Sequence, residues 1–378
     1  MAPKKGNQPI QFHTIRYAPP PVDLPVYGSA SPEELCVLGR TNYVAPTDGQ
    51  RYVYGILAED RLKHMQVIGK SGSGKTKFIE SMIRQDLTQK HPVVLFDSSG
   101  EAARSLVSFL PQEQKAQARI IGLAGYEGIN VMPQDESGAV TFIDTLIAAA
   151  EEYFGEKFPH DTVANTRAAY LSTKPGTFPG LVRTLTSNAT TKPIATFITE
   201  LFADGNVESL LTGPPLGKEL RNEGALTIVA LHEHILGSKR TKAVTALITD
   251  ALLRSASYNK DPLYWYIDGA QVLPQNSGMR LVDMASSQNI ALTVTHRYYS
   301  ELDETFMRHL STVTGTQVFF RLGGDDASRA RQEALQSLDA RDFLILRPQQ
   351  YYIRLSINGI IQQPFSAEAL TLTDGKGK

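Results

Sequence analysis

Residues 64–87, HMQVIGKSGSGKTKFIESMIRQDL, decide the fold of this chain. They join a short apolar run, His64 to Ile68, to an amphipathic segment that starts at Lys75, through a loop rich in glycine and serine. The loop is a complete G-x-x-x-x-G-K-T motif, and a strand before it and a helix after it are the context that a phosphate-binding loop requires. The sequence therefore predicts a strand–loop–helix unit that binds a nucleotide.

The motif predicts a role for its own residues. Glycines permit the tight curl with which backbone N–H groups surround phosphate oxygens. Lys75 is expected to reach the β- and γ-phosphates, and the Thr76 hydroxyl is expected to bind Mg²⁺. ATP and Mg²⁺ are therefore the expected ligands. The predicted nucleotide-binding residues are Gly69, Lys70, Ser71, Gly72, Ser73, Gly74, Lys75 and Thr76.

Beyond the motif, short apolar runs alternate with amphipathic segments from Tyr52 onward. Strands that alternate with helices indicate crossover connections and a parallel sheet. From about Ser137 to Thr212 the strand pattern is absent and apolar residues recur at helical spacing. The sequence thus predicts an α/β fold with a mostly parallel central sheet and an inserted all-α subdomain. The expected strands are 64–68, 93–96, 225–230, 263–267, 291–294 and 317–320, with a closing pair at 343–346 and 351–356.

Composition and spacing divide the chain into five expected parts. Eight of the 21 prolines lie in the first 50 residues, and proline stiffens a chain and removes hydrogen-bond donors. The parts are a proline-rich arm at 1–51, the first part of an ATPase domain at 52–136, the helical subdomain at 137–212, the second part of the ATPase domain at 213–365 and a flexible tail at 366–378.

Charge and cysteine content exclude several classes of protein. Lysine plus arginine (38) nearly cancels aspartate plus glutamate (39), which argues against a wholly basic protein that coats DNA and leaves room for a local basic channel. The single cysteine, Cys36, excludes an internal disulfide framework. Apolar runs fall far short of the roughly 20 residues of a membrane helix, and the N-terminus lacks the apolar core of a signal peptide. The expected location is the cytoplasm.

A second buried strand supplies the acid that such a nucleotide site needs. The apolar run Leu263 to Ile267 ends at Asp268, which is expected to hold the magnesium shell together with Thr76. Most hydrolysing enzymes of this type place a glutamate directly after that aspartate to orient the attacking water, and here the next residue is Gly269. General-base assistance contributes roughly 10²–10⁴-fold in rate.

Longer stretches resemble a known family. EDRLKHMQVIGKSGSGKTKFIESMIRQDL and PVVLFDSSGEAARSLVSFLP resemble the DNA-binding ATPase domain of type IV secretion and conjugative coupling proteins, in the FtsK/HerA superfamily. ALTVTHRYYSELDETFMRHLSTVTGTQVFFRLGGDDASRA is similar to the sensor strand of that family and the segment after it, and INGIIQQPFSAEAL is similar to its closing hairpin. The resemblance implies a RecA-like P-loop fold with an all-α insertion, usually assembled as a hexameric ring that moves DNA through its centre.

Three positions depart from the family pattern. Gly269 replaces a glutamate, although Gln271 keeps a nearby family glutamine. The sensor strand ends in His296-Arg297 where relatives have His-Gln, and a cation can clamp a γ-phosphate but cannot act as a base. The turn 97–101 has lost its histidine. Either another carboxylate acts, with Glu101 the nearest candidate by motif, or hydrolysis is slow or lost; Glu101 also suits a plain first-turn acid.

Arg321, in FFRLGG, matches an arginine that is common in the family. In a ring it could reach the γ-phosphate of a neighbouring subunit, and such arginine fingers contribute roughly 10³–10⁵-fold. The alternative is a strand-end arginine paired with Asp325 or Asp326. The predicted catalytic set is therefore Lys75, Asp268, Arg297, Arg321 and Glu101.

Three functions follow from these residues and this resemblance. The first is an ATP-dependent DNA translocase or coupling ATPase, with DNA, further copies of the same chain in a hexamer, and a secretion or conjugation channel component as partners. The second is an ATP-binding scaffold or regulatory subunit with slow or no hydrolysis, which Gly269 and Arg297 favour. The third is a motor for DNA segregation, repair or packaging.

Four weaker features have plainer interpretations. His232-Glu233-His234 has the spacing of a metal-binding pair, but no third ligand lies nearby in sequence, so a loop is favoured. Lys239-Arg240-Thr241-Lys242 could contact DNA phosphates, with a solvated helix start favoured. Tyr298-Tyr299 and Tyr351-Tyr352 could stack on bases, with ordinary packing favoured. Cys36 has no nucleophilic partner and is expected to be inert.

Overall fold

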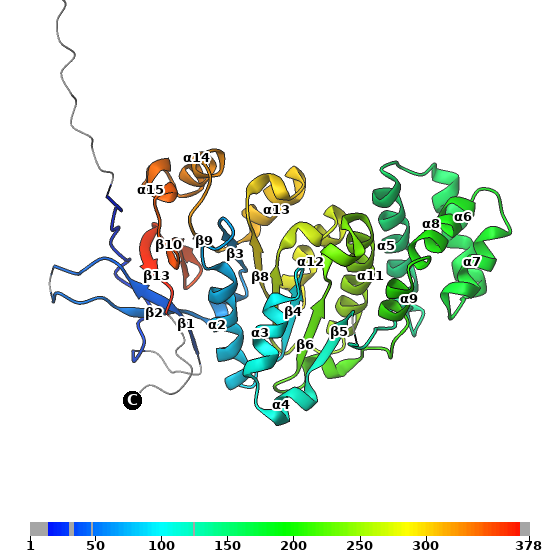
Figure 1. Cartoon of the computed structure of the whole chain (residues 1–378), viewed down its shortest axis with the longest axis horizontal. Helices are drawn as coiled ribbons and strands as arrows, with labels where there is room; N and C mark the ends of the chain where they lie inside the picture. The colour runs from blue at the N-terminus through cyan, green and yellow to red at the C-terminus, as the bar shows by residue number, and fades with distance from the viewer. Residues whose placement is uncertain (1–13, 30–33, 47, 124, 371–378) are drawn as a thin grey trace, which may run out of the picture.

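A computed structural model describes residues 14–29, 34–46, 48–123 and 125–370 of the chain. One 11-stranded sheet runs through it, in the order β2-β1-β13-β10-β9-β3-β8-β7-β4-β6-β5. Helices cover the sheet, and a group of helices forms a separate lobe beyond α11 (Figure 1). The predicted α/β architecture is confirmed.

Seven neighbouring strands, from β9 to β5 in the sheet order, pair in parallel. Their side chains alternate between two apolar cores: Val94 and Phe96 face one, and Val93 and Leu95 face the other. Burial on both faces explains the continuous apolar runs in the sequence. The seven are β3 (Met65–Ile68), β4 (Val93–Asp97), β5 (Arg119–Gly122), β6 (Leu226–Ala230), β7 (Leu263–Asp268), β8 (Ile290–His296) and β9 (Thr316–Phe319).

Antiparallel strands complete the other end of the sheet, and they include residues of the predicted arm and of the predicted tail. Residues 35–41 of the predicted arm form β1, because this proline-free run buries Leu35, Cys36 and Leu38 against the second core. Residues 366–368 of the predicted tail belong to β13, while 1–13 and 371–378 lie outside the described residues. The strands are β1 (Leu35–Thr41), β2 (Val53–Leu57), β10 (Gln350–Arg354) and β13 (Phe365–Glu368), with a separate hairpin of β11 (Ser356–Ile357) and β12 (Ile360–Ile361).

The strand predicted at 343–346 is wrong. Residues Ala340–Leu344 form the short helix α15, because Asp339 and Asp342 make a reciprocal capping box at its N-terminus. Phe343 is still buried, but it packs against the aromatic rings of Phe319 and Tyr352 from a helix. Phe343 is buried, as the apolar pattern indicated. The capping box gives the segment a helical backbone instead of a strand.

Helices on the two faces of the sheet follow the crossovers. α2 buries Phe78, Ile79, Met82 and Ile83, which recur at the spacing of one helix face. The sheet-covering helices are α2 (Lys75–Thr88), α3 (Glu101–Phe109), α4 (Gln112–Gln117), α11 (Ser238–Ala256), α12 (Gln275–Ser287), α13 (Glu304–Val313) and α14 (Gly324–Glu333). Two four-residue helices, α1 (Ala58–Arg61) and α10 (Glu233–Leu236), lie in connections, as do the 3₁₀ turns η1 (Lys218–Arg221), η2 (Ala270–Val272) and η3 (Tyr299–Glu301).

The predicted all-α insertion is confirmed as the lobe in Figure 1. It consists of α5 (Ser137–Phe154), α6 (His160–Thr173), α7 (Phe178–Thr186), α8 (Lys192–Phe202) and α9 (Gly205–Leu211). The rings of Tyr170 and Phe178 both lie against Phe142, which ties three of these helices together. The boundaries at 137 and 212 remain a proposal. Within the described ranges, every helix is too short or too polar to span a bilayer.

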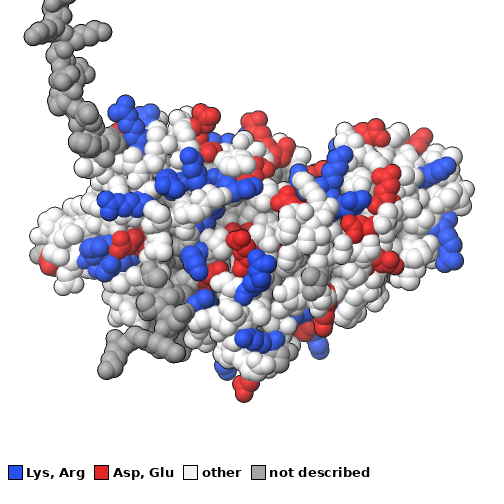
Figure 2. Space-filling view, viewed as in Figure 1, with Lys and Arg blue, Asp and Glu red and all other residues white. Residues whose placement is uncertain are grey.

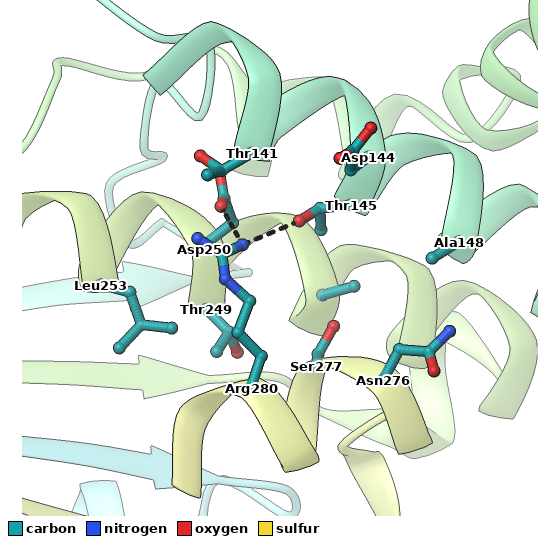
Figure 3. Close-up of a pocket in the computed structure, with 11 residues that line it drawn as sticks. Thr141, Asp144, Thr145, Ala148, Thr249, Asp250, Leu253, Asn276, Ser277 and Arg280 are labelled. Atoms are coloured by element: carbon teal, nitrogen blue, oxygen red, sulfur yellow. Dashed lines mark hydrogen bonds and ion pairs between the residues drawn. The ribbon is translucent and has the colours of Figure 1, made fainter. Parts of the chain in front are cut away.

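A polar joint connects the lobe to the sheet domain (Figure 3). α5 packs against α11, and a pocket of about 260 Å³ lies between α5, α11 and α12. On its wall Arg280 donates to Asp250 (2.6 Å) and to Thr145 (3.1 Å), and Arg254 also pairs with Asp250 (2.9 Å). α12 follows the segment that leaves the nucleotide site, so this joint links that segment to the lobe.

Candidate nucleotide-binding site

The phosphate loop spans residues 69–74 between β3 and α2. Gly72 and Gly74 have φ of 72° and 116°, which is a left-handed backbone that favours glycine. A Cβ at Gly69 would lie 2.5 Å from Cβ of Phe320. The Gly69 N–H donates to the His296 carbonyl at the end of β8 (3.2 Å). The loop is therefore held against the carboxyl end of the sheet, where ligands of open α/β folds bind.

Lys75 points into the hollow of this loop. Its Nζ donates to the carbonyl oxygens of Gly69 (2.5 Å) and Lys70 (3.3 Å). Burial lowers the pKa of Lys75, with Asp268 acting in the opposite direction. Ser73 Oγ is buried without a hydrogen-bond partner among the described residues. The loop thus presents a cation and an unpaired hydroxyl, together with its backbone N–H groups, which is a donor set that suits phosphate oxygens.

Asp268 and Thr76, the two predicted metal ligands, are in contact. Thr76 Oγ1 donates to Asp268 Oδ2 (2.9 Å), and Thr295 Oγ1 donates to Asp268 Oδ1 (2.7 Å). Asp268 lies at the end of β7, beside Asp97 of β4 and Thr295 of β8 in the sheet register. Burial raises the pKa of the Asp268 carboxyl, and its two hydroxyl partners oppose that shift. The sheet therefore places a carboxylate and a hydroxyl together at the mouth of the loop.

A pocket of about 460 Å³ opens over these groups. Four of the five predicted catalytic residues line it, namely Lys75, Asp268, Arg297 and Glu101, and Arg321 does not. The other lining residues are Ser71, Gly72, Gly74, Thr76, Lys77, Ser98, Ser99, Gly269, Gln271, Thr295, His296, Pro348 and Gln349. Residues 98–101, 268–271 and 295–297 come from three different strand ends, so only the sheet order brings them together.

Gly269 adopts a backbone that disfavours the missing glutamate. Its φ is 90°, in the left-handed region, and its N–H donates to Thr295 Oγ1 (3.1 Å). A Cβ built there would overlap Ser98 Oγ and would lie 2.9 Å from Gln271 Oε1. The space that a side chain at 269 would fill is therefore already taken by Ser98 and Gln271.

Arg297 is held by a partner that the sequence did not reveal. Its Nε donates to Glu301 Oε1 (2.5 Å), its N–H donates to Glu301 Oε2 (2.7 Å), and its guanidinium pairs with the same carboxylate. The Glu301 carboxylate is 3% exposed and raises the pKa of Arg297. Arg297 lies on the pocket wall, and a buried acid balances its charge.

Glu101 lies at the exposed start of α3, on the rim of the pocket. Its N–H donates to Ser99 Oγ (3.1 Å). The neighbouring acid Asp97 is fully buried and accepts hydrogen bonds from the N–H groups of Ser99 (3.0 Å) and Ala103 (2.8 Å). The turn 97–101 therefore uses Asp97 to anchor α3, and Glu101 keeps a first-turn helical position.

Arg321 follows β9, and its carbonyl accepts from the Lys70 N–H (2.8 Å). Its side chain makes no hydrogen bond or ion pair with any other described residue. The alternative pairing with Asp325 or Asp326 is therefore absent from the described chain, and Asp326 instead accepts from the Tyr299 N–H (3.0 Å).

The weaker sequence features lie on a turn, at a helix start and in a buried strand. His232 and His234 follow β6 in a left-handed turn and in α10, and no described cluster of three His, Cys, Asp or Glu side chains suits a metal ion. Lys239–Lys242 occupies the first turn of α11, where Lys242 pairs with Glu152 (3.0 Å). Tyr351 and Tyr352 are fully buried, which excludes base stacking by their rings in this conformation.

Comparison with known proteins agrees with this geometry. A sequence model described as the type IV secretion-system coupling protein DNA-binding domain matches residues 55–113. A search of curated proteins finds no match. Residues 55–113 are thus similar to the DNA-binding domain of these coupling proteins. The matched residues include the phosphate loop and the turn after β4.

Solved structures extend the likeness, as a likeness in fold, to most of the chain. Plasmid coupling protein TrwB with a non-hydrolysable ATP analogue aligns at a TM-score of 0.68, with 12% identity and 97% of each chain covered. VirB4 of Thermoanaerobacter pseudethanolicus aligns at 0.68, with 13% identity, 89% of this chain and 96% of that one. TrwB with ADP and Mg²⁺ aligns at a TM-score of 0.63, with 12% identity, and the alignment covers 85% of this chain and 89% of that one. The predicted RecA-like P-loop fold is confirmed.

Proposed function

We propose that this chain is an ATP-dependent coupling ATPase that moves DNA, or DNA with bound protein, in a conjugation or type IV secretion-like system. The contact of Thr76 with Asp268 beside the Lys75 loop carries the proposal, because it joins the parts that phosphoryl transfer needs. The matched coupling-protein family supports DNA as the substrate.

The residues present fit ATP and Mg²⁺. Loop N–H groups, Ser73 Oγ and Lys75 would hold the phosphates, and Thr76 with Asp268 would hold the metal ion. When bound, Mg²⁺ neutralises charge on the β- and γ-phosphate oxygens. TrwB, which has the same fold, is solved with ADP and Mg²⁺. Without a nucleotide, Lys75 Nζ donates hydrogen bonds to carbonyl oxygens of the loop. Nucleotide binding would redirect Nζ to the phosphates.

A ring of several copies, six by resemblance, would complete the site. Arg321 supports this arrangement because its guanidinium has no partner among the described residues of its own chain. Figure 2 shows basic side chains gathered over the half of the molecule that holds the sheet, with acidic ones among them, and a more even mixture over the helical lobe. This pattern supports a local DNA contact. The proposed function also includes a secretion or conjugation channel component as a binding partner and a location in the cytoplasm.

One observation favours a second function, an ATP-binding scaffold with slow or no turnover. Gly269 is in a left-handed conformation and has no room for a carboxylate-bearing side chain. The usual water-orienting group is therefore missing from its usual position, and a scaffold would need only the loop and the metal ligands.

Steady-state ATP hydrolysis with and without double-stranded DNA tests the first function against the second. The coupling ATPase should turn over ATP at about 1 s⁻¹ or faster with DNA, in the range of working enzymes. Lys75→Ala should abolish both the basal and the DNA-stimulated rates. ATP binding without measurable turnover would establish the scaffold, and the absence of ATP binding would contradict both functions.

A further inference from the structure

The side-chain amide of Gln271 lies at the edge of the nucleotide pocket, three residues after Asp268. Its Nε2 donates to Glu233 Oε2 (3.2 Å). Glu233 begins α10, and its N–H donates to the Ser98 carbonyl (3.0 Å). Glu233, whose carboxylate binds the Gln271 amide, is therefore anchored to Ser98 at the end of β4, and Ser98 also borders Gly269.

The oxygen of this amide has no hydrogen-bond partner in the part of the chain that the structure describes. Gln271 Oε1 is buried and accepts no hydrogen bond from any described residue. A carboxylate accepts hydrogen bonds only, so Glu233 requires the NH₂ group of Gln271 and thereby leaves Oε1 on the other side. Leaving such an acceptor unsatisfied costs about 1–3 kcal/mol, and unsatisfied groups in native structures call for an explanation such as a functional role.

The Gln271 amide lies beside the position from which a side chain at 269 would extend. Its Oε1 is 2.9 Å and its Nε2 is 3.1 Å from the position of a Cβ on Gly269. The absence of a side chain at 269 therefore gives the amide of Gln271 access to the space beside the metal-binding carboxylate. The unpaired oxygen therefore borders the position from which the missing acid would extend.

We propose that Gln271 orients the water that attacks the γ-phosphate, and that Glu233 is a positioning residue that fixes the Gln271 amide. This inference rests on the proposed ATP hydrolysis. Gln271 Oε1 would accept a hydrogen bond from one O–H of the water. This bond would direct the water oxygen toward the γ-phosphorus. An amide cannot take up a proton, so Gln271 orients the water without acting as a base.

The bonds and charges balance without a carboxylate base. The water oxygen forms a bond to the γ-phosphorus, and the bond from that phosphorus to the β–γ bridging oxygen breaks, with its electron pair leaving on ADP. The proton of the water passes to a γ-phosphate oxygen, giving dihydrogen phosphate. Phosphoryl transfer through a loose transition state depends mainly on positioning and charge stabilisation, which an oriented amide can assist.

The other acids around the pocket are less suited to this task. Glu301 is already bound to Arg297 through both carboxylate oxygens. Glu101 is exposed at the rim, at the first turn of α3. Asp97 accepts hydrogen bonds from the turn that it anchors. Among the described residues around the pocket, Gln271 combines a fixed amide with an unpaired oxygen beside Gly269.

The test compares Gln271→Ala and the similarly sized Gln271→Met with Glu233→Ala and Glu233→Gln, and Gln112→Ala on the exposed first turn of α4 is the matched control. Both Gln271 variants should lower kcat by about 10²-fold, near the low end for assisted proton or water chemistry, with KM for ATP nearly unchanged. Glu233→Ala should lower kcat by roughly 10-fold through misplacement of the amide. Glu233→Gln, which can still accept from Nε2, should recover most of that loss.

A binding measurement separates water orientation from a structural role. ADP with aluminium fluoride mimics the transferring phosphoryl group, and transition-state mimics bind more tightly than ground-state ligands. The Gln271 variants should bind ADP like the unchanged protein and lose the extra affinity for ADP with aluminium fluoride. Equal losses for both ligands would mean a structural role and would overturn the inference.

The remaining outcomes distinguish this inference from the proposed function. Hydrolysis by the unchanged protein with full kcat in both Gln271 variants would overturn the inference and leave the ATPase standing. Loss of kcat only in Glu101→Gln would assign the task to Glu101 and also overturn it. ATP binding without turnover in the unchanged protein would reject both the hydrolysis and the inference, in favour of the scaffold.

Discussion

Two histidines, His64 and His296, lie buried beside the strand that carries the phosphate loop. His64 Nε2 contacts Ser286 Oγ (3.1 Å), and His296 Nε2 contacts the Gln66 side chain (2.9 Å). Burial lowers the pKa of both histidines from 6.5 to about 4. Both rings are therefore neutral in the folded protein at neutral pH, and folding excludes their protonated forms.

These histidines predict acid sensitivity. Because folding lowers the pKa of both histidines, the unfolded chain binds more protons than the folded protein between about pH 6.5 and 4. The free energy of unfolding therefore has its full value above pH 6.5 and falls as the pH drops through this window. The loss should be about 3 kcal/mol per histidine at the acid end of this window, of which about 2 kcal/mol should appear by pH 5. Urea unfolding at pH 7.5 and 5 checks the sign. The double variant His64→Asn/His296→Gln should flatten this slope.

Cys36 is predicted to be unreactive in the folded protein. Burial raises the pKa of its thiol to about 12, and the thiolate is the reactive form. Alkylation by iodoacetamide at pH 8 should be at least ~100-fold slower in the native state than in urea. Fast native labelling would show that β1 leaves the sheet readily.

Gly269→Glu is predicted to fail as a restoration of the missing glutamate. A φ of 90° and the overlap of its Cβ with Ser98 Oγ should cost about 1–3 kcal/mol of stability. Turnover should not rise, because the backbone must first leave its left-handed conformation. Chemical denaturation and ATPase rates check both points. Gly205→Glu, at an open helix start, should change stability by no more than about 0.5 kcal/mol.

At the scale of elements, the joint of α5, α11 and α12 determines how the helical lobe is attached. Asp250 is 1% exposed and accepts from Arg280 of α12 and Arg254 of its own helix. Arg280 also reaches Thr145 on α5, so one guanidinium spans three helices (Figure 3). Removal of one partner from a buried charge is costly because the remaining charge stays desolvated.

Arg280→Ala is therefore predicted to destabilise the protein by about 2 kcal/mol, since Arg254 still balances Asp250. Arg308→Ala is the control, because its pair with Glu304 has both side chains more than 70% exposed and should contribute at most ~0.5 kcal/mol. Thermal unfolding and limited proteolysis of the lobe report the difference. Equal effects of the two substitutions would show that the joint is not stabilising.

At the scale of the whole molecule, Arg321 predicts cooperation between copies of the chain. Arg321→Ala should leave ATP affinity unchanged and lower DNA-stimulated kcat by about 10³-fold, as expected for an arginine that acts in trans. A mixture of Arg321→Ala and Lys75→Ala subunits should regain part of the rate, because mixed interfaces pair an intact Lys75 with an intact Arg321. No recovery on mixing would place the effect within one subunit.

The sequence alone determined the features that depend on neighbours along the chain. The phosphate loop 69–76, the alternation of strands and helices, the helical insertion and the position of Asp268 at a strand end were all predicted from local patterns. Local patterns suffice there for two reasons. The eight contiguous residues of the phosphate-loop motif determine the backbone of the loop. The spacing of apolar side chains along the chain indicates which face of a strand or helix is buried.

Only the tertiary structure decided which distant side chains meet. The Glu233–Gln271 contact joins residues 38 positions apart, and β1 pairs with β13 at the other end of the chain. The pairing of Arg297 with Glu301 is local in sequence, yet the burial of Glu301 that makes it effective comes from the surrounding fold. Spacing along a chain cannot report such contacts, because sheet order and packing set these distances after the strands have assembled.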